Sequence, residues 1–496
     1  MAHGTADLGL LTPQSTFYDQ GRFGRLFPTL PAFAADTPSV REALTELGKR
    51  GGPMDARDNL GDATLLITNP GRAVRNPDNP TQPAGMTFLG QFLDHDMTFD
   101  PTSSLARRQD PESIRNFRIP ALDLDSVYGG GPGVSPHLYD RTIDHGSTTL
   151  LVEQITGSGS VSIDGADRFD LPRNAQATAL LGDPRNDENL IVSQLHLAFL
   201  RFHNRVVIDL RTDMPSLTAD ELFAEAQRVV RWHYQWIVLH EFLPATIGAD
   251  LTEELMTEGR KHYNWRNNPY IPVEFAVAAY RFGHSQVRPS YRANFGTDAD
   301  DLAHQFIGFI FDHRAMDPTD PDDLRGGCRA ARRYIDWQTF FDFGDGRMRH
   351  NKRIDATLST SLFRLPGFGD GAGASLATRN LLRNLTLKVP SGQRVARAMQ
   401  LPELAAADLS ELADLELDRR TPLWFYVLRE ADVLADGKHL GPVGGRIVGE
   451  VIHGLIDGDA SSYLSQDPDW TPTYGTDDTF AMTDLLTAAG VVGSLG

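Results

Sequence analysis

Cysteine is almost absent from this chain of 496 residues, in which Cys328 is the single example. One thiol excludes an intrachain disulfide and any metal site built from several cysteines, and it favours a reducing compartment. Long apolar runs are also lacking, since no stretch approaches the roughly 18 residues that span a bilayer. The first residues show no basic segment followed by an apolar one. We therefore expect a cytoplasmic protein, or one exported by a route without an N-terminal Sec signal.

Positive charge is scarce as well. The chain has 47 lysines and arginines against 66 aspartates and glutamates, which gives a formal net charge of −19. This balance argues against nucleic acid and anionic membrane surfaces as partners. With 41% hydrophobic residues, the chain can still bury a large core and enclose a cofactor.

The organisation of the chain is that of one unit. No repeat or convincing linker divides it, so the sequence predicts a single domain over residues 1–496, with residues 1–60 as an irregular N-terminal arm. Helical periodicity dominates, and the clearest β signal is a small hairpin over residues 148–163 that turns at Gly157–Gly159. The oligomeric state is left open.

The most informative stretch is a predicted helix over residues 87–99. Helical spacing places Gln91, Asp94 and His95 on one face. Neighbours in a helix are about 100° apart, so Asp94 and Asp96 point about 200° apart and cannot serve the same small site. A solvated acidic turn with a capping aspartate explains this stretch, taken alone, equally well.

A second acidic pattern lies in the extended segment after Pro120. Asp123 and Asp125 fall on one face of that segment, and two carboxylates on a tethered backbone suit a hard cation with oxygen ligands. A solvated strand face is the simpler interpretation unless a third acidic ligand exists. Asp96 is the available third ligand.

A long predicted helix follows Gly182 and carries Arg185 and Glu188 at its start. An ordinary ion pair, with the carboxylate near the helix N-terminus, is the common outcome for two such residues. His196 and His203 lie seven residues apart on this helix. Two histidines alone are more often packed and hydrogen-bonded than bound to a metal, so we expect no metal there.

Another predicted helix, over residues 273–287, carries a lone histidine, His284, in small and apolar surroundings. A lone histidine is usually structural, although Gly283 and Ala278 would let a flat ligand approach closely. Farther along, helical periodicity buries Asn380 among leucines.

Taken together, five motifs resemble the animal-type haem peroxidases of the peroxidase–cyclooxygenase superfamily in order and context. Five ordered motifs over roughly residues 60–460 are far more specific than any one of them. They are Gly90-Gln91-Phe92-Leu93-Asp94-His95-Asp96, Leu122-Asp123-Leu124-Asp125-Ser126-Val127-Tyr128-Gly129, Gly182-Asp183-Pro184-Arg185 with Glu188, Leu197-Ala198-Phe199-Leu200-Arg201-Phe202-His203-Asn204-Arg205, and Arg281-Phe282-Gly283-His284. The chain resembles the bacterial, disulfide-free members. The resemblance implies a mainly α-helical fold with a small β-hairpin and with haem between distal and proximal helices.

The resemblance also implies roles for residues around a b-type-derived haem. His284 would be the proximal iron ligand, with its other ring nitrogen held by Asn380. Arg281 would pair with a haem propionate. Asp94 and Glu188 match the carboxylates that form ester bonds to haem methyl groups in the family.

On the distal side, the resemblance assigns acid–base chemistry to His95, which would move a proton between the oxygens of hydrogen peroxide. Arg185 would stabilise the charge that develops on them, and Gln91 would order the distal water or halide. The residue after Glu188 is Asn189, whereas the neutrophil enzyme has a methionine there that forms a sulfonium link.

A calcium ion is the second cofactor that the resemblance implies. Its ligands would be Asp96, Asp123 and Asp125, with the backbone carbonyls of Ile119 and Ala121. Two departures from the family pattern concern this loop. Ile119 replaces a residue that usually offers a hydroxyl, and Asp125 stands where serine is common in animal members.

The sequence therefore predicts a peroxidase that reduces hydrogen peroxide and oxidises a small organic donor, a halide or a pseudohalide. A fatty-acid oxygenase of the same superfamily is one rival, but its radical tyrosine lies three residues before the proximal histidine, where this chain has Arg281. Tyr280 lies one residue farther off and should face elsewhere on the helix. A non-enzymatic haem or calcium scaffold is the second rival, with little use for Gln91, His95 and Arg185.

Overall fold

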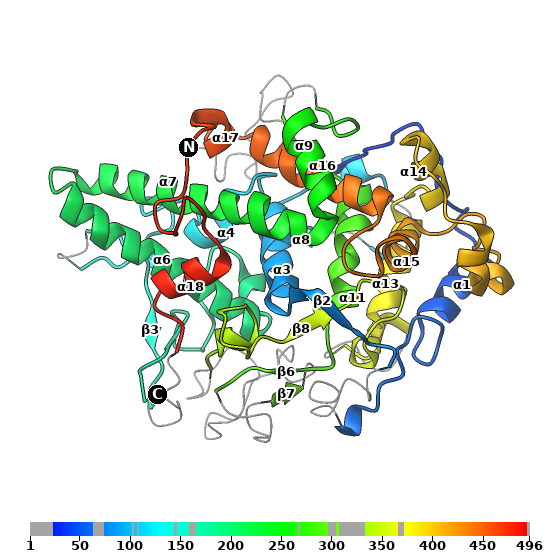
Figure 1. Ribbon diagram of the computed structural model, residues 1–496, viewed down its shortest axis with the longest axis horizontal. Helices are drawn as coiled ribbons and strands as arrows, with labels where there is room; N and C mark the ends of the chain where they lie inside the picture. Colours follow the sequence, from blue (N-terminus) through cyan, green and yellow to red (C-terminus); the bar gives the residue numbers. More distant parts are fainter. Residues whose placement is uncertain are drawn as a thin grey trace.

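The fold is mainly α-helical, as the sequence predicts, and its helices surround a central one, α3 (Gly85–Met97), in the computed structural model (Figure 1). The structure describes residues 23–62, 74–101, 104–106, 109–142, 146–157, 165–265, 268–295, 304–306, 333–365 and 372–493. Cys328 lies outside these ranges. Among the described helices, none has both the length and the apolar character needed to cross a bilayer.

The other α-helices are α1 (Pro38–Gly48), α4 (Asp125–Tyr128), α6 (Leu190–Asp213), α7 (Ala219–Ile237), α8 (Leu243–Ile247), α9 (Ala249–Glu258), α10 (Val273–Ala276), α11 (Gly283–Gln286), α13 (Leu376–Thr386), α14 (Gly392–Ala398), α15 (Leu423–Ala435), α16 (Pro442–Asp457), α17 (Tyr463–Gln466) and α18 (Met482–Ala488). Two short 3₁₀ helices matter for the site, namely η5 (Pro184–Asp187) and η7 (Ala279–Phe282). A π-helical turn, η6 (Val238–Phe242), joins α7 to α8.

Side-chain caps begin the long antiparallel helices α6 and α7. Asn189 accepts a hydrogen bond from the backbone of Val192 at 2.9 Å and so starts α6. Thr218 and Glu221 form a reciprocal capping box that starts α7. Local sequence thus fixes where each of these helices enters the core.

The central position of α3 comes from its aromatic residues and from one glycine. Phe92 stacks on Phe199 of α6 with ring centroids 4.8 Å apart, and it meets the edge of Tyr234 of α7. At Gly85, a Cβ atom would lie 2.4 Å from the ring of Phe341, so only glycine allows this close approach. Packing from several directions therefore fixes the rotation of α3 about its own axis.

The strands are short, and most contain buried residues. β1 (Phe23–Gly24) pairs with β5 (Ile271–Pro272) in parallel. The other three pairs are antiparallel: β2 (Asp78–Pro83) with β8 (His350–Lys352), β3 (Glu153–Gln154) with β4 (Phe169–Asp170), and β6 (Ser290–Arg292) with β7 (His304–Phe306).

The predicted hairpin over residues 148–163 is only partly present. Its first half supplies β3, but the partner strand β4 comes later in the chain than the prediction placed it. Residues 158–164, which include part of the predicted turn, lie outside the described residues.

The continuous helix predicted over residues 273–287 is wrong. The chain forms α10, η7 and α11 in succession, and Ala278 has the non-helical angles φ −132° and ψ −83°. The side-chain amide of Asn384 from α13 donates to the carbonyl of Val277 at 2.6 Å. A tertiary contact therefore takes a carbonyl that a continuous helix would have used internally.

The described part of the predicted N-terminal arm, from residue 23 on, is ordered against the main body. Its helix α1 begins after the capping residue Thr37 and packs on α13. Leu44 and Leu47 on its inner face are fully buried.

Candidate functional site

A cavity of about 610 Å³ lies between α3 on one side and the η7–α11 segment on the other. Its wall includes the residues that the sequence singles out for haem and peroxide, namely Gln91, Asp94, His95, Arg185, Glu188, Arg281 and His284. These side chains come from α3, from η5 and the residue after it, and from η7 and α11. The structure thus brings together residues that are up to about two hundred positions apart in the chain.

His95 is buried on α3, with each ring nitrogen near a different partner. Its Nδ1 donates to Oδ1 of Asn186 at 2.8 Å, and its Nε2 lies 3.4 Å from Oε1 of Glu188. Gln91 donates to the same Glu188 oxygen and accepts from the side chain of Asn189 at 3.2 Å. The cap residue of α6 therefore also orients Gln91.

Arg185 is held by a dense set of acceptors. Its Nε donates to Asp183 at 3.1 Å, and its Nη2 donates to Asp183 at 2.8 Å and to the carbonyls of His95 and Thr98. The guanidinium lies over the ring of Phe99, 4.7 Å from its centroid. None of its hydrogen bonds to the described residues uses Nη1, and Arg185 lines the cavity.

Asp183 anchors two arginines at once and is completely buried. It also bonds Arg118 at 2.9 Å, and Arg118 in turn lies 3.3 Å from Asp125. Burial alone would raise the pKa of Asp183, but its bond to Arg185 and the charges of Arg185 and Arg118 outweigh burial and lower that pKa.

On the opposite wall, the side-chain amide of Asn380 lies 2.7 Å from Nδ1 of His284. Nε2 is therefore the ring nitrogen left for the cavity. Burial, followed by the charge of Arg281, lowers the pKa of His284 to about 3. The imidazole is consequently neutral near pH 7, which is the form that binds metal ions.

Positive charge gathers beside His284. Arg281 donates to the carbonyl of Ala276 at 3.0 Å, and burial lowers the pKa of its guanidinium. Arg379 and Arg383 on α13 act electrostatically on it, and burial and Arg281 lower the pKa of Arg383 to about 10. The sequence analysis missed these two residues. Arg379 and Arg383 are four residues apart, so helical spacing would have placed them on one face of the helix.

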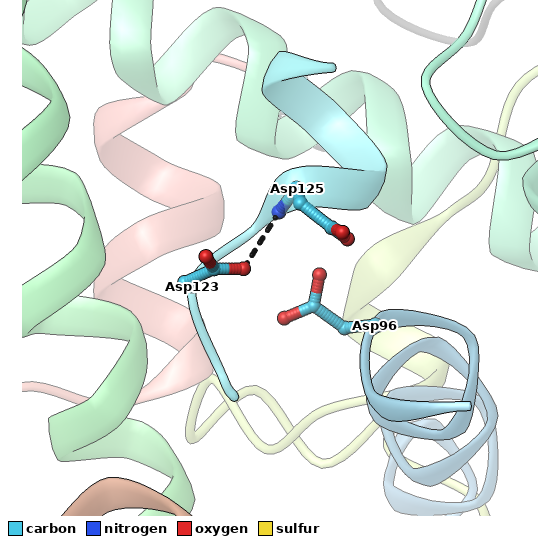
Figure 2. Close-up of side chains that lie close together, drawn as sticks. All are labelled: Asp96, Asp123 and Asp125. Carbon is cyan, nitrogen blue, oxygen red and sulfur yellow. Dashed lines mark hydrogen bonds between the residues drawn. The ribbon is translucent and has the colours of Figure 1, made fainter. Parts of the chain in front are cut away.

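The three aspartates predicted to bind a cation meet behind α3, as Figure 2 shows. Carboxylate oxygens of Asp96, Asp123 and Asp125 all lie within 4.8 Å of one another, and all three residues are buried. The backbone N–H of Asp125 donates to Asp123 at 3.1 Å. Asp96 therefore faces this cluster while Asp94 lines the cavity, in keeping with the 200° separation.

Donors surround Asp96 inside this cluster. It accepts from the backbone of Leu124 at 3.0 Å, from the hydroxyl of Ser126 at 2.9 Å and from the hydroxyl of Tyr234 at 3.3 Å. Burial, and then the charge of Asp123, raise its pKa to about 7. These carboxylates are thus costly to keep ionised together without a cation.

The two predicted backbone ligands lie just before the cluster in the chain. The carbonyl of Ile119 accepts a hydrogen bond from the N–H of Ala121 at 2.8 Å. Burial also raises the pKa of Asp125 well above its usual value, although the neighbouring Arg118 opposes this effect.

The prediction that Tyr280 faces elsewhere is wrong. Tyr280 lines the cavity, and its hydroxyl donates to the carbonyl of Gly90 on α3 at 3.0 Å. The prediction assumed a regular helix, whereas Tyr280 belongs to the 3₁₀ turn η7, in which the angle between neighbouring residues differs.

The histidines of α6 are packed and hydrogen-bonded, as expected. His203 accepts from the hydroxyl of Tyr128 at 3.1 Å and donates to the carbonyl of Thr148 at 2.9 Å. His196 bonds to Asn186, a contact that the sequence analysis missed. Asn186 stands between two charged residues in the sequence, and no local pattern marks it as buried.

Comparison with known proteins identifies a matching family model and similar proteins. The family model described as animal haem peroxidase matches residues 107–309. Thyroid peroxidase of Homo sapiens is 27% identical over 272 residues, which cover 50% of this chain and 28% of that protein. Peroxinectin A of Dictyostelium discoideum is 25% identical over 345 residues, which cover 68% of this chain and 58% of that protein. The chain thus matches between about a quarter and three fifths of the length of these relatives.

Solved structures share the fold. Peroxidase A from Dictyostelium discoideum superimposes with a TM-score of 0.62 and 16% identity, covering 96% of this chain and 94% of that one. The fatty acid alpha-dioxygenase of Oryza sativa gives a TM-score of 0.59 and 14% identity, covering 96% and 80%. Residues 107–309 of this chain thus match the animal haem peroxidase family, and the chain shares its fold with a solved peroxidase.

Proposed function

We propose that this protein is a haem peroxidase that reduces hydrogen peroxide and oxidises a small organic donor, a halide or a pseudohalide. One observation carries the proposal: a single cavity holds His95, Gln91 and Arg185 on one wall and a neutral His284 on the other. Each group has the chemistry that its proposed role requires, and a relative and a solved structure with the same fold are peroxidases by name.

The residues of the cavity fit a flat, anionic, iron-centred cofactor. His284 would bind the iron through Nε2, which requires its proton on Nδ1, and the side-chain amide of Asn380 would then turn its oxygen, in place of the nitrogen that now lies there, towards Nδ1. A Cβ atom at Gly283 would meet nothing within 4 Å, so the backbone beside His284 borders open space. Arg281, with Arg379 and Arg383 nearby, would neutralise the propionates. When bound, haem supplies an iron that accepts oxidising equivalents from peroxide and passes them to the donor.

The distal residues would handle the proton and the charge. His95 donates from Nδ1 to Asn186, so Nε2 would take the proton of hydrogen peroxide and return it to the departing oxygen. Arg185 would stabilise negative charge on the separating oxygens through Nη1, while its other nitrogens hold it in place. Gln91 would order a water molecule or halide beside them.

Asp94 and Glu188 would form ester bonds to the haem. Both line the cavity, at the side that would receive peroxide. Asn189 has no thioether and instead caps α6 and bonds Gln91, so a sulfonium link is not part of the proposal.

Calcium would occupy the cluster behind α3. Asp96, Asp123 and Asp125 supply hard oxygen ligands, and the carbonyls of Ile119 and Ala121 would complete the set. Because Asp96 follows His95 directly, a cation there would also fix the end of α3 that carries the distal base.

One observation favours a second candidate, a fatty-acid oxygenase. Tyr280 of η7 lines the cavity, although it does not stand three residues before His284. A visible absorption spectrum of the purified protein tests for haem. A peroxide-dependent donor assay, run beside an oxygen-uptake assay with linoleate, then separates the candidates. Oxygen uptake that depends on Tyr280, without donor oxidation, would replace the peroxidase proposal, and a protein that binds no haem would end both.

A further inference from the structure

The ring nitrogen of His95 that points away from the cavity meets a completely buried asparagine. Nδ1 of His95 donates to Oδ1 of Asn186 at 2.8 Å, and Nδ2 of Asn186 donates to Nδ1 of His196 at 2.9 Å. His95 and His196 are buried too. Two histidines from different helices, α3 and α6, are thereby joined through one amide.

An amide offers one acceptor and one donor group, and this constrains both rings. With Oδ1 towards His95 and Nδ2 towards His196, the first ring must carry its proton on Nδ1 and the second must leave Nδ1 bare. Burial lowers the pKa of His196 to about 3, so it stays a neutral acceptor over the physiological range. The amide can therefore turn over and keep both hydrogen bonds only if the two rings exchange tautomers at the same time.

The backbone around Asn186 is fixed by the turn that also presents Arg185. Asp183 caps η5 by accepting from the backbone of Arg185 at 2.8 Å, and the N–H of Asn186 donates to the carbonyl of Asp183 at 3.1 Å. One short turn therefore sends Arg185 to the cavity and Asn186 to the far side of the distal histidine.

We propose that Asn186, backed by His196, is a positioning residue that holds His95 in the tautomer whose Nε2 presents a lone pair to the cavity. In the other tautomer Nε2 would carry a proton and could not accept one from a bound acid. The proposal rests on the peroxidase function proposed above, because that function requires the distal histidine to accept a proton at Nε2.

Three substitutions separate positioning from mere support. Asn186→Leu keeps the branched shape and the number of side-chain heavy atoms, although it is larger, and removes both hydrogen bonds. Asn186→Asp keeps an acceptor for His95 and removes the donor to His196. His196→Gln disturbs only the outer partner, and His203→Gln is the matched control, because His203 is an equally buried histidine of α6 that bonds Tyr128 and Thr148 instead.

Three ligands report on the haem-loaded variants. Hydrogen peroxide and hydrogen cyanide must both give up a proton on reaching the ferric iron, whereas carbon monoxide binds the ferrous iron without proton transfer. For Asn186→Leu we expect the rates with peroxide and cyanide to fall together by about 10- to 100-fold, since losing the tautomer of a catalytic histidine elsewhere costs up to about 10⁴. Carbon monoxide association should change less than about two-fold, because the path to the iron is kept.

The peroxide and cyanide rates of the remaining variants should depend on which hydrogen bonds each variant keeps. We expect Asn186→Asp to retain cyanide and peroxide rates within about five-fold of the unaltered protein, His196→Gln to lie between the two Asn186 variants, and His203→Gln to change neither rate. If Asn186→Leu does not hold haem, the proposal is tested by comparing the peroxide and cyanide rates of Asn186→Asp with those of His196→Gln. We expect His196→Gln to lose more of both rates than Asn186→Asp.

Two results would overturn the proposal. One is an Asn186→Leu protein that binds cyanide as fast as the unaltered chain, and the other is an equal loss with cyanide and carbon monoxide, which marks a collapsed pocket. An unaltered protein that binds cyanide but does not reduce peroxide would refute the proposed function alone, because the cyanide comparison still tests Asn186.

Discussion

Replacing Asp183 by asparagine should destabilise the protein and weaken its distal site at the same time. The buried carboxylate bonds Arg118 at 2.9 Å and Arg185 at 2.8 and 3.1 Å. Asparagine has nearly the same shape, but it has no charge and turns an amino group towards one of the two guanidinium groups. Its packing effect is therefore small, and its electrostatic effect is large.

The size of the loss follows from what each arginine keeps. Removing one partner of a buried ion pair costs about 3–5 kcal/mol. Arg118 retains Asp125 and the carbonyl of Gly182, and Arg185 retains two backbone carbonyls, so we expect a loss of about 2–3 kcal/mol at pH 7. We also expect the rate of peroxide reduction to fall by about 10-fold or more, because Arg185 loses its side-chain anchor.

The pH dependence has a definite sign. The pKa of Asp183 is lower in the folded protein than in the unfolded chain, so its contribution is complete above the unfolded value near 4 and is lost as the pH falls below it. The difference between the two proteins should therefore be constant near neutrality and shrink in acid. Urea unfolding followed by circular dichroism at several pH values measures it.

The control is an exposed ion pair. Glu403→Gln removes the partner of Arg397 at the surface and should change stability by less than about 0.5 kcal/mol. If Asp183→Asn were as harmless as this control, the carboxylate would not be the anchor of the two arginines, and the reasoning would fail.

Four further outcomes are expected. His95→Ala should slow peroxide reduction by about 100-fold or more, as stopped-flow mixing will show, and a rate within a few-fold of normal would remove its role. Asp96→Ala should lose bound calcium and, with it, haem content and stability. Finding no calcium by metal analysis, together with an unaffected variant, would refute the site. After peroxide treatment, haem should stay with the polypeptide through acid–acetone extraction, and intact-mass analysis should trace the link to Asp94 and Glu188. A bare polypeptide mass contradicts it. Because Asn189 cannot form a sulfonium, bromide, iodide or thiocyanate should be oxidised better than chloride at neutral pH, and efficient chloride oxidation would contradict this.

The distal helix could be predicted because its pattern is local. The angle between neighbouring helical residues alone separates Asp94 from Asp96, and the structure has them on the cavity and in the acidic cluster respectively. Helical periodicity indicated many helices, whereas the family resemblance supplied the fold class, and motif order supplied the residues that come together from distant segments.

The proximal segment could not be predicted because tertiary contacts override its helical pattern. A side chain of α13, Asn384, takes a carbonyl of the segment, and the break turns Tyr280 into the cavity. Asn186 was missed for a related reason, since burial of a polar residue depends on which distant groups satisfy it. Likewise, the partner of β3 depends on the course of the chain between the strands.

The two faces of α3 restrict how the length of this helix can change. One residue inserted between Gln91 and His95 would advance everything after it by about 1.5 Å and rotate it by about 100°. His95 would leave the cavity and Asp96 would leave the acidic cluster in the same step, and neither shift could be repaired without undoing the other. Compensation would require about a full turn of added helix. Insertions and deletions in descendants of this chain should therefore avoid α3 and collect in the connections between the outer helices.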